Sequence, residues 1–160
     1  MFKLFHKEKK PVELCTPVTG KSIAIETVPD KVFANKMMGD GVAFSFEGNQ
    51  VCAPCDGKIV MIADTLHAFG MEAVNGAEIL IHIGMDTVEL NGKGFTKLVE
   101  ADTKVKKGDP IIQLDRAVLK ELGVELITPM VVTNGDDFKL QIEEVNKNVT
   151  VGEDIVITIE

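Results

Sequence analysis

The chain has 160 residues, 45% of them hydrophobic, which is enough apolar material for the core of one ordinary domain and excludes a disordered chain. Its formal net charge is −8 at pH 7, and an acidic protein repels phosphate backbones, so nucleic acid is excluded as an expected partner. No apolar run approaches the ~20 residues of a membrane-spanning helix and the first residues do not resemble a secretion signal, which predicts a cytoplasmic protein.

The first ten residues differ in character from the rest. Residues 1–10 contain four lysines beside Phe2, Leu4 and Phe5. We predict a flexible basic tail with at most weak contact to anionic lipid, because stable anchoring takes more than one weak signal. Residues 11–160 contain no flexible linker and are predicted to form one domain.

Short β-branched runs separated by Pro–Gly or Gly–Asp turns follow along the domain, a pattern typical of an all-β antiparallel sandwich or barrel. The predicted strands, in chain order, are 21–25, 42–46, 50–52, 58–63, 68–72, 78–83, 103–105, 110–114, 126–132 and 155–159. Two short helices are predicted as well. One covers 31–37 and ends at Gly39; the other covers 116–122, between an N-cap at Asp115 and Gly123.

Two turn-and-strand segments occur twice. Cys-Thr-Pro-Val-Thr-Gly-Lys at 15–21 returns as Cys-Ala-Pro-Cys-Asp-Gly-Lys at 52–58, and the segment at 105–112 returns at 149–156. These internal repeats indicate a duplicated motif within the β fold.

The cysteines invite a redox interpretation, because Cys52 and Cys55 stand in a Cys-x-x-Cys arrangement. A reactive pair of this kind sits at a helix N-terminus, which lowers the thiol pKa. Here a turn at Asp56 and an alternating strand follow instead. We therefore interpret both cysteines as small apolar side chains flanking a turn, with the redox role as the alternative.

Two histidines are the candidate functional residues. In the strand 78–83, Ile79, Ile81 and Ile83 are predicted to face one way, which leaves His82 on the opposite face with Glu78 and Leu80. His67 lies earlier at a strand edge, where Thr65 could hydrogen-bond and orient it. A neutral imidazole is a nucleophile near pH 7, so this pair suits group transfer; the alternative is two solvated surface histidines.

The surrounding motifs resemble one family. Gly-Asp-Gly at 39–41, Leu-His-Ala-Phe at 66–69 and His-x-Gly-x-Asp-Thr-Val-x-Leu at 82–90 are similar to the glucose-family IIA domain of the bacterial sugar phosphotransferase system. The resemblance covers roughly 11–160 with the motifs in the family's order. It implies an antiparallel β-sandwich with a duplicated motif, and either a free-standing protein or a piece of a larger transporter.

The resemblance also implies a relay. A domain of this family accepts a phosphoryl group from the phosphocarrier HPr on one histidine and passes it to a cysteine of a IIB domain, which phosphorylates sugar during uptake. His82 matches the phosphorylated histidine, with attachment expected at Nε2. His67 matches the second histidine, which stabilises transferred charge, and Thr65 matches the residue that orients it. No cofactor or metal is implied, and the sugar is not readable from this chain.

Other positions match the family's partner-binding surface. Asp30 and Asp86 match acidic positions near the active histidine and would pair with basic side chains of partners. An apolar patch around the site is expected from Val32, Phe33, Met37, Met38 and Leu80. For each of these, a plain surface or core role is the alternative.

Two further functions stay open. A zinc hydrolase would use His67, His82 and Asp86 as ligands, but a zinc site needs three or four ligands within tetrahedral reach and the usual His-x-His pair is absent. Adventitious zinc between the two histidines is compatible with either interpretation. A regulatory module that changes partners with its phosphorylation state is compatible with the relay.

Overall fold

The computed structural model describes residues 10–160, so all but the last residue of the predicted tail lie outside it. Its strands are β1 Val12–Cys15, β2 Gly20–Ala24, β3 Asp40–Phe46, β4 Gln50–Cys52, β5 Gly57–Ile62, β6 Ala68–Ala73, β7 Glu78–His82, β8 Phe95–Lys97, β9 Lys104–Val105, β10 Pro110–Leu114, β11 Thr128–Val132, β12 Leu140–Ile142, β13 Asn148–Val149 and β14 Ile155–Ile159. The helices are α1 Lys31–Ala34 and α2 Arg116–Glu121, with 3-10 turns at Ile25–Thr27, Thr87–Leu90 and Gly135–Asp137. No helix in this part of the chain is long and apolar enough to cross a membrane.

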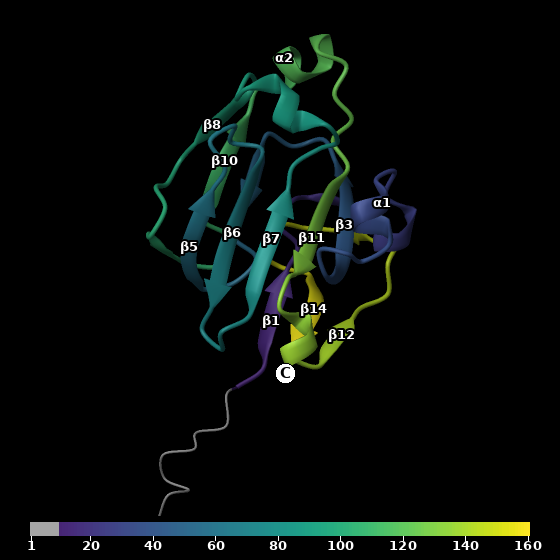
Figure 1. Cartoon of the computed structure of the whole chain (residues 1–160), viewed down its shortest axis with the longest axis vertical. Coiled ribbons are helices and arrows are strands. Elements are labelled where there is room, and N and C mark those ends of the chain that lie inside the picture. Colours follow the sequence, from purple (N-terminus) through teal and green to yellow (C-terminus); the bar gives the residue numbers. More distant parts are fainter. Residues whose placement is uncertain (1–9) are drawn as a thin grey trace, which may run out of the picture.

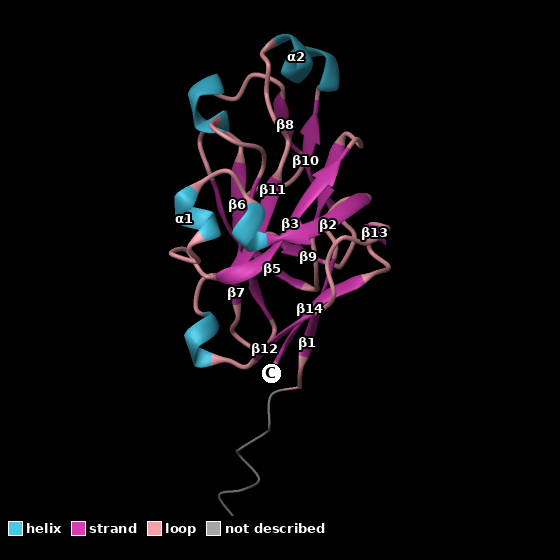
Figure 2. Ribbon diagram, turned by 90° about the vertical axis from the view of Figure 1, so that its right-hand side faces the viewer, coloured by secondary structure: helices cyan, strands magenta, loops and turns pink. Residues whose placement is uncertain are grey.

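The strands form one large sheet and two small ones (Figure 1). The large sheet has the order β13-β2-β3-β11-β7-β6-β5-β9, and the small sheets have the orders β1-β14-β12 and β4-β10-β8. Seen from the side, α1 lies on one side of the large sheet and β14 on the other (Figure 2). The predicted all-β antiparallel sandwich with two short helices is confirmed.

The main core lies on the inner face of the large sheet. Side chains along β7 point alternately to the two faces of the sheet, so every second one enters this core. Ile79, Ile81 and Ile83 are 2% exposed or less, whereas Leu80 and His82 on the opposite face are only partly buried. This is the alternation that the sequence predicts. His82 is therefore carried on the outer face by a strand whose inner face is anchored in the core.

The predicted elements differ from the structure mainly at their ends. The helix predicted over 31–37 is wrong in length, because α1 ends at Ala34 and Lys36 adopts a left-handed backbone with φ 58°. The helix predicted over 116–122 lies at α2, where Asp115 accepts a hydrogen bond from the Val118 N–H. Four strands escape sequence prediction. They are β1, β8, β12 and β13, each four residues or shorter.

The two repeats occupy equivalent places in the fold. The first copy contacts the second reciprocally: the Cys15 N–H donates to the Pro54 carbonyl at 2.8 Å, and the Cys52 N–H donates to the Pro17 carbonyl at 2.9 Å. Strand β13 then pairs with β2 just as β9 pairs with β5. The duplication read from the sequence is thus a structural one, with two similar turn-and-strand halves meeting near Pro17 and Pro54.

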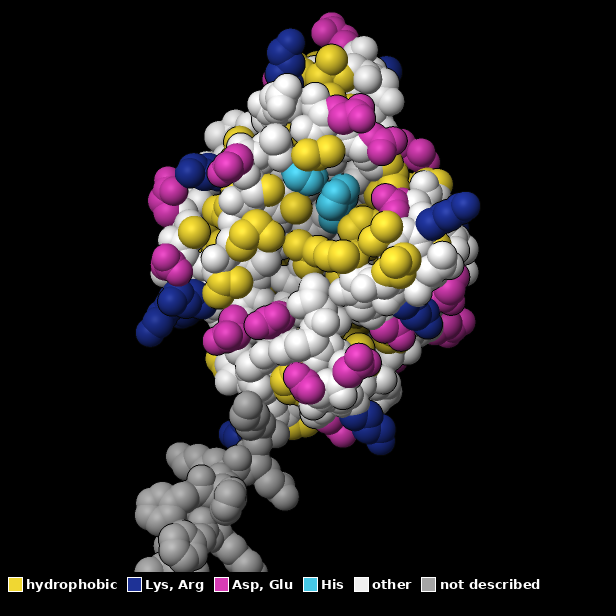
Figure 3. Space-filling model, viewed as in Figure 1, with side chains coloured by type: hydrophobic (Ala, Val, Ile, Leu, Met, Phe, Trp, Pro, Cys, Tyr) yellow, Lys and Arg dark blue, Asp and Glu magenta, His cyan; other side chains and the backbone are white. Residues whose placement is uncertain are grey.

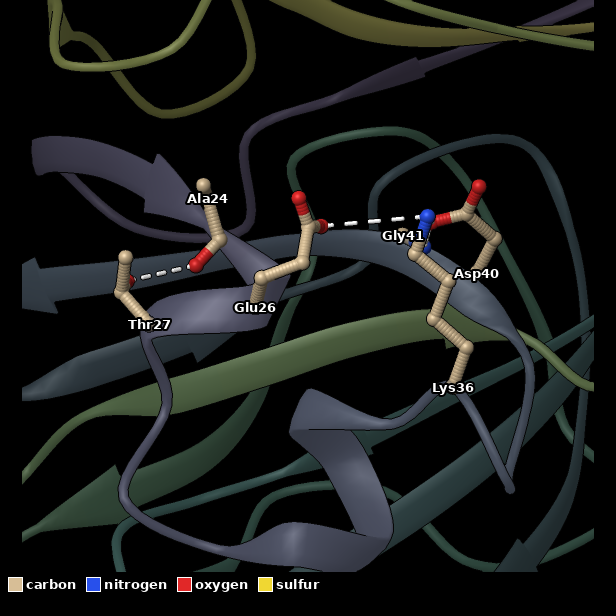
Figure 4. A network of polar contacts seen from close by, with 6 residues as sticks. All are labelled: Ala24, Glu26, Thr27, Lys36, Asp40 and Gly41. Carbon is tan, nitrogen blue, oxygen red and sulfur yellow. Dashed lines mark hydrogen bonds and ion pairs between the residues drawn. The ribbon is translucent and has the colours of Figure 1, made fainter.

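A segment between β2 and β3 covers part of the outer face. Ile25, Val28 and Phe33 of this segment pack with Ala43 and Val131 in a second buried cluster. Its edge is fastened by polar contacts (Figure 4): the Lys36 ammonium lies 3.9 Å from Glu26 and 3.5 Å from Asp40. Exposed ion pairs stabilise by at most about 1 kcal/mol, so the apolar cluster contributes most of the free energy that keeps this segment on the sheet.

Gly41 marks a very close approach of β3 to β11. A Cβ at this position would lie 1.9 Å from the Met130 carbonyl oxygen, which is backbone and cannot swing away. We expect Gly41→Ala to reduce the free energy of unfolding by about 3 kcal/mol or more, measured by urea denaturation. Gly48→Ala is the matched control, because a Cβ there meets nothing within 4 Å; its stability should stay within about 0.5 kcal/mol. Equal effects of the two substitutions would contradict the close approach.

Candidate functional site

His82 ends β7 with one ring nitrogen committed to the backbone. Its Nδ1 lies 2.9 Å from the Gly84 carbonyl oxygen. A carbonyl can only accept a hydrogen bond, so Nδ1 carries the proton and donates it. In the neutral imidazole this leaves Nε2 with a free lone pair. This carbonyl partner is not predicted above, although the His-x-Gly spacing is its signal in the sequence.

His67 stands beside His82 with its ring turned on edge. The ring centroids are 4.9 Å apart and the planes are 80° to each other. The Nδ1 of His67 lies 2.6 Å from the Thr65 hydroxyl. In the tautomer in which this hydroxyl donates, Nε2 of His67 carries the proton and can donate a hydrogen bond. The structure therefore brings the three predicted residues into one group.

The loop after His82 is held in a fixed shape. Gly84 has φ 78°, and a Cβ there would lie 2.7 Å from the Thr87 side chain. The Thr87 hydroxyl in turn donates to the Ile83 carbonyl at 2.6 Å, and the Met85 N–H donates to the Glu125 carbonyl at 3.0 Å. Because these contacts fix the peptide of Gly84, the carbonyl that orients His82 is rigidly placed.

Burial keeps both imidazoles neutral. It lowers the pKa of His82 below the ordinary value of 6.5, although the Gly84 carbonyl and, more weakly, the charges of Asp30 and Asp86 raise it. Burial also lowers the pKa of His67, with a further contribution from the positive charge that His82 would carry. Near pH 7 the pair is thus uncharged and His82 can act as a nucleophile.

These directions predict the pH dependence of the site. A lowered pKa means that the neutral, reactive form of His82 persists at lower pH than in an exposed histidine, so its loss should be centred below pH 6.5. The check is an NMR titration of the imidazole carbon-bound protons between pH 4.5 and 8, with a short histidine-containing peptide as the comparison. A His82 midpoint at or above pH 6.5 would contradict the prediction.

An apolar surface surrounds the two histidines, with acidic side chains at its rim (Figure 3). Of the predicted patch, Val32, Met37 and Met38 are exposed by 41%, 72% and 39%. Leu80 is partly buried. Phe33 differs: it is 5% exposed, and its ring lies 5.1 Å from that of His82, so it packs against the imidazole as part of the core.

The two predicted acidic residues flank the site in different ways. Asp30 is the N-cap of α1, where its carboxylate accepts a hydrogen bond from the Val32 N–H at 2.9 Å. Asp86 has a left-handed backbone with φ 56° in the loop after His82. Each is close enough for its charge to act on His82.

Sequence reasoning missed the part of the patch that comes from β5 and β6. Met61 is 42% exposed and pairs with Gly70, which in turn pairs with Leu80. A Cβ on Gly70 would lie 3.8 Å from the Met61 methyl group, so the methionine lies over the glycine and extends the surface beyond Leu80. Only the strand pairing reveals this row.

The cysteines lie away from this site. Cys15, Cys52 and Cys55 are all buried and free. Burial raises the pKa of Cys52 to about 11 and that of Cys55 to about 12, which disfavours the reactive thiolate. Among residues 10–160 no group of three or more His, Cys, Asp or Glu side chains is arranged to hold a metal ion.

Known proteins share this sequence and fold. The family described as phosphoenolpyruvate-dependent sugar phosphotransferase system, EIIA 1, matches residues 12–138. The chain is 46% identical over 133 residues to the PTS system glucose-specific EIIA component of Borreliella burgdorferi, which covers 83% of this chain and 70% of that protein. It is also similar to the solved structure of glucose permease IIA from Mycoplasma capricolum, with a TM-score of 0.83, 35% identity, and coverage of 94% and 96% of the two chains.

Proposed function

The chain belongs to the EIIA 1 family of the phosphoenolpyruvate-dependent sugar phosphotransferase system, and we propose that residues 11–160 carry the phosphoryl group on Nε2 of His82. As a member of this family it is a phosphotransfer component, with HPr as donor and a IIB domain as acceptor. One observation supports the assignment most: the bond from Nδ1 to the Gly84 carbonyl leaves Nε2 as the free nucleophilic atom.

The proposed transfer is a displacement at phosphorus. The lone pair of His82 Nε2 forms a new N–P bond as the bond between phosphorus and the donor breaks, and the donor leaves with that electron pair. The product stays labile because imidazole is a good leaving group, which suits a relay. His67 donates from Nε2 to the phosphoryl oxygens, on which negative charge accumulates, while Thr65 holds its tautomer.

The sugar depends on the IIB domain that accepts the phosphoryl group. Both named relatives carry glucose in their names, so we propose that the IIB partner of this chain serves glucose uptake. The apolar patch of Val32, Met37, Met38, Leu80 and Met61 would contact both partners in turn. Its three methionines suit this task, since the unbranched thioether side chain repacks against different surfaces.

The acidic rim should affect the encounter with basic partners. We expect the double variant Asp30→Asn, Asp86→Asn to accept phosphoryl groups about tenfold more slowly at low salt, because the steering charges are gone. The difference should shrink at high salt, where charges are screened. Asp102→Asn with Glu13→Gln is the matched control, since both carboxylates are exposed and neither is among the charges that act on His82. A salt-independent loss would point to misfolding instead.

The direct test is incubation with phosphoenolpyruvate, enzyme I and HPr, followed by intact-mass analysis. The proposal expects one added phosphoryl group per chain, labile in acid and stable in base, and located on His82 by fragmentation. Adding the glucose-specific IIB domain should then remove it. If HPr becomes phosphorylated but this chain does not, the proposed function is wrong.

A further inference from the structure

The residue between Thr65 and His67 has an unusual backbone. Leu66 adopts φ 61°, in the left-handed region that bulky L-residues rarely enter. It lies in the tight connection from β5 to β6, where the Ala63 N–H donates to the Ala68 carbonyl and the Leu66 N–H donates to the Ala63 carbonyl at 2.7 Å. Such a hairpin needs a left-handed residue after its turn, and glycine or asparagine is the usual choice.

The leucine is retained in this conformation by packing. Its side chain is partly buried and lies against the main core. One of its methyl groups lies 3.9 Å from the place where a side chain on Gly92 would begin, and Gly92 belongs to the loop that follows the 3-10 turn Thr87–Leu90. Packing of the Leu66 side chain against the main core therefore holds the hairpin in place and offsets the cost of its left-handed backbone.

The kink has a direct effect on its two neighbours. Side chains two residues apart on a regular strand lie roughly 7 Å apart, too far for a hydrogen bond. The left-handed residue between them brings the Thr65 hydroxyl within 2.6 Å of the His67 ring. The His67 carbonyl is meanwhile held by the Ile83 N–H at 2.7 Å, so the direction of its ring depends on the turn.

From this geometry we infer that Leu66 is a positioning residue for phosphoryl transfer: its left-handed backbone, anchored by its side chain, sets the Thr65–His67 contact and turns His67 toward His82. The inference rests on the proposed relay. It needs no contact between Leu66 and the phosphoryl group. Substitutions that allow the left-handed conformation but lack the leucine side chain therefore test the anchor by itself.

Two variants test the anchor. Leu66→Gly removes it together with the restriction on φ, so the turn can still reach the left-handed conformation but is no longer held in it. Leu66→Asn removes the anchor but still favours the left-handed region. We expect Leu66→Gly to slow transfer from phosphorylated His82 to the IIB domain by about tenfold or more, because misplaced groups lose rate steeply. Leu66→Asn should lie between this variant and the parent protein.

Two readouts distinguish positioning from loss of stability. Nitrogen NMR should show His67 changing from one tautomer in the parent to a mixture in Leu66→Gly. Ile142→Ala is the control, since Ile142 is also partly buried against the main core but lies in β12. It should lower the melting temperature while leaving the His67 tautomer and the transfer rate unchanged.

The outcomes are separable. If the parent protein never becomes phosphorylated, the proposed function fails; the NMR comparison then still tests whether Leu66 orients His67. If the parent is active and Leu66→Gly keeps both the parental tautomer and transfer rate, the positioning role is overturned. If Leu66→Gly does not fold, Leu66→Asn carries the same test, and a parental tautomer and rate in that variant with a lowered melting temperature would reduce Leu66 to a packing residue.

Discussion

The His82→Ala variant is expected to gain no phosphoryl group from phosphorylated HPr, even after long incubation. The reason is that the free Nε2 lone pair exists on this ring alone: His67 has its Nδ1 occupied by Thr65, and its Nε2 carries the proton in the tautomer proposed here. Loss of the nucleophile removes the covalent step itself rather than slowing it. Intact-mass analysis after incubation with the donor measures the result.

The control is a variant that keeps the size of the side chain. His82→Gln retains an amide that can still donate toward the Gly84 carbonyl, so its melting temperature should remain close to that of the parent protein while phosphorylation is lost. Because His82 is only partly buried, neither substitution is expected to unfold the chain. A phosphoryl group found on His67 in either variant would contradict the assignment of the nucleophile.

The His67→Ala variant should behave differently, because it removes a donor and keeps the nucleophile. We expect it still to become phosphorylated on His82, while transfer onward to the IIB domain falls by about 10²–10³-fold, the usual effect of losing one donor to a charged transition state. A quenched-flow experiment that starts from the phosphorylated variant measures this step alone. The chain would then accumulate in its phosphorylated form.

Partial recovery should come from His67→Gln, whose amide offers an N–H close to the position of the lost imidazole. The Thr65→Val variant tests the same step indirectly, since it keeps the ring and removes only the 2.6 Å contact that selects the tautomer. We expect its transfer rate to lie between that of the parent and that of His67→Ala. An onward rate unchanged by His67→Ala would show that the second histidine does not assist the relay.

The strand that carries His82 could be predicted from the sequence, because its hydrophobic alternation depends only on residues that are neighbours in the chain. Alternation alone separates Ile79, Ile81 and Ile83 from His82, and the capping pair Asp115 and Gly123 marks the second helix in the same local way. The charge-stabilising role of His67, in contrast, came from the family resemblance, although the spacing already indicated that Thr65 could orient its ring. Nothing in the spacing alone indicated that the two histidines would meet.

What sequence reasoning missed depends on contacts between distant segments. Met61 joins the apolar patch only because β5 is paired so that it lies over Gly70. Strands such as β12 and β13 are too short to show a period and are defined by their partners. Leu66 gave no turn signal at all, since leucine is not a residue that marks a left-handed position.

The two halves of the fold contribute different parts of the site. In one half, the connection between β2 and β3 is long, and it folds back over its own strands to build the Phe33 cluster. In the other half, the equivalent connection between β5 and β6 is a tight hairpin that holds Thr65 and His67. The first connection therefore supplies an apolar surface beside His82, and the second supplies the histidine and the threonine that orients it. Two copies of one motif thus contribute to a single site in different ways, because the connections that follow their first strands differ in length.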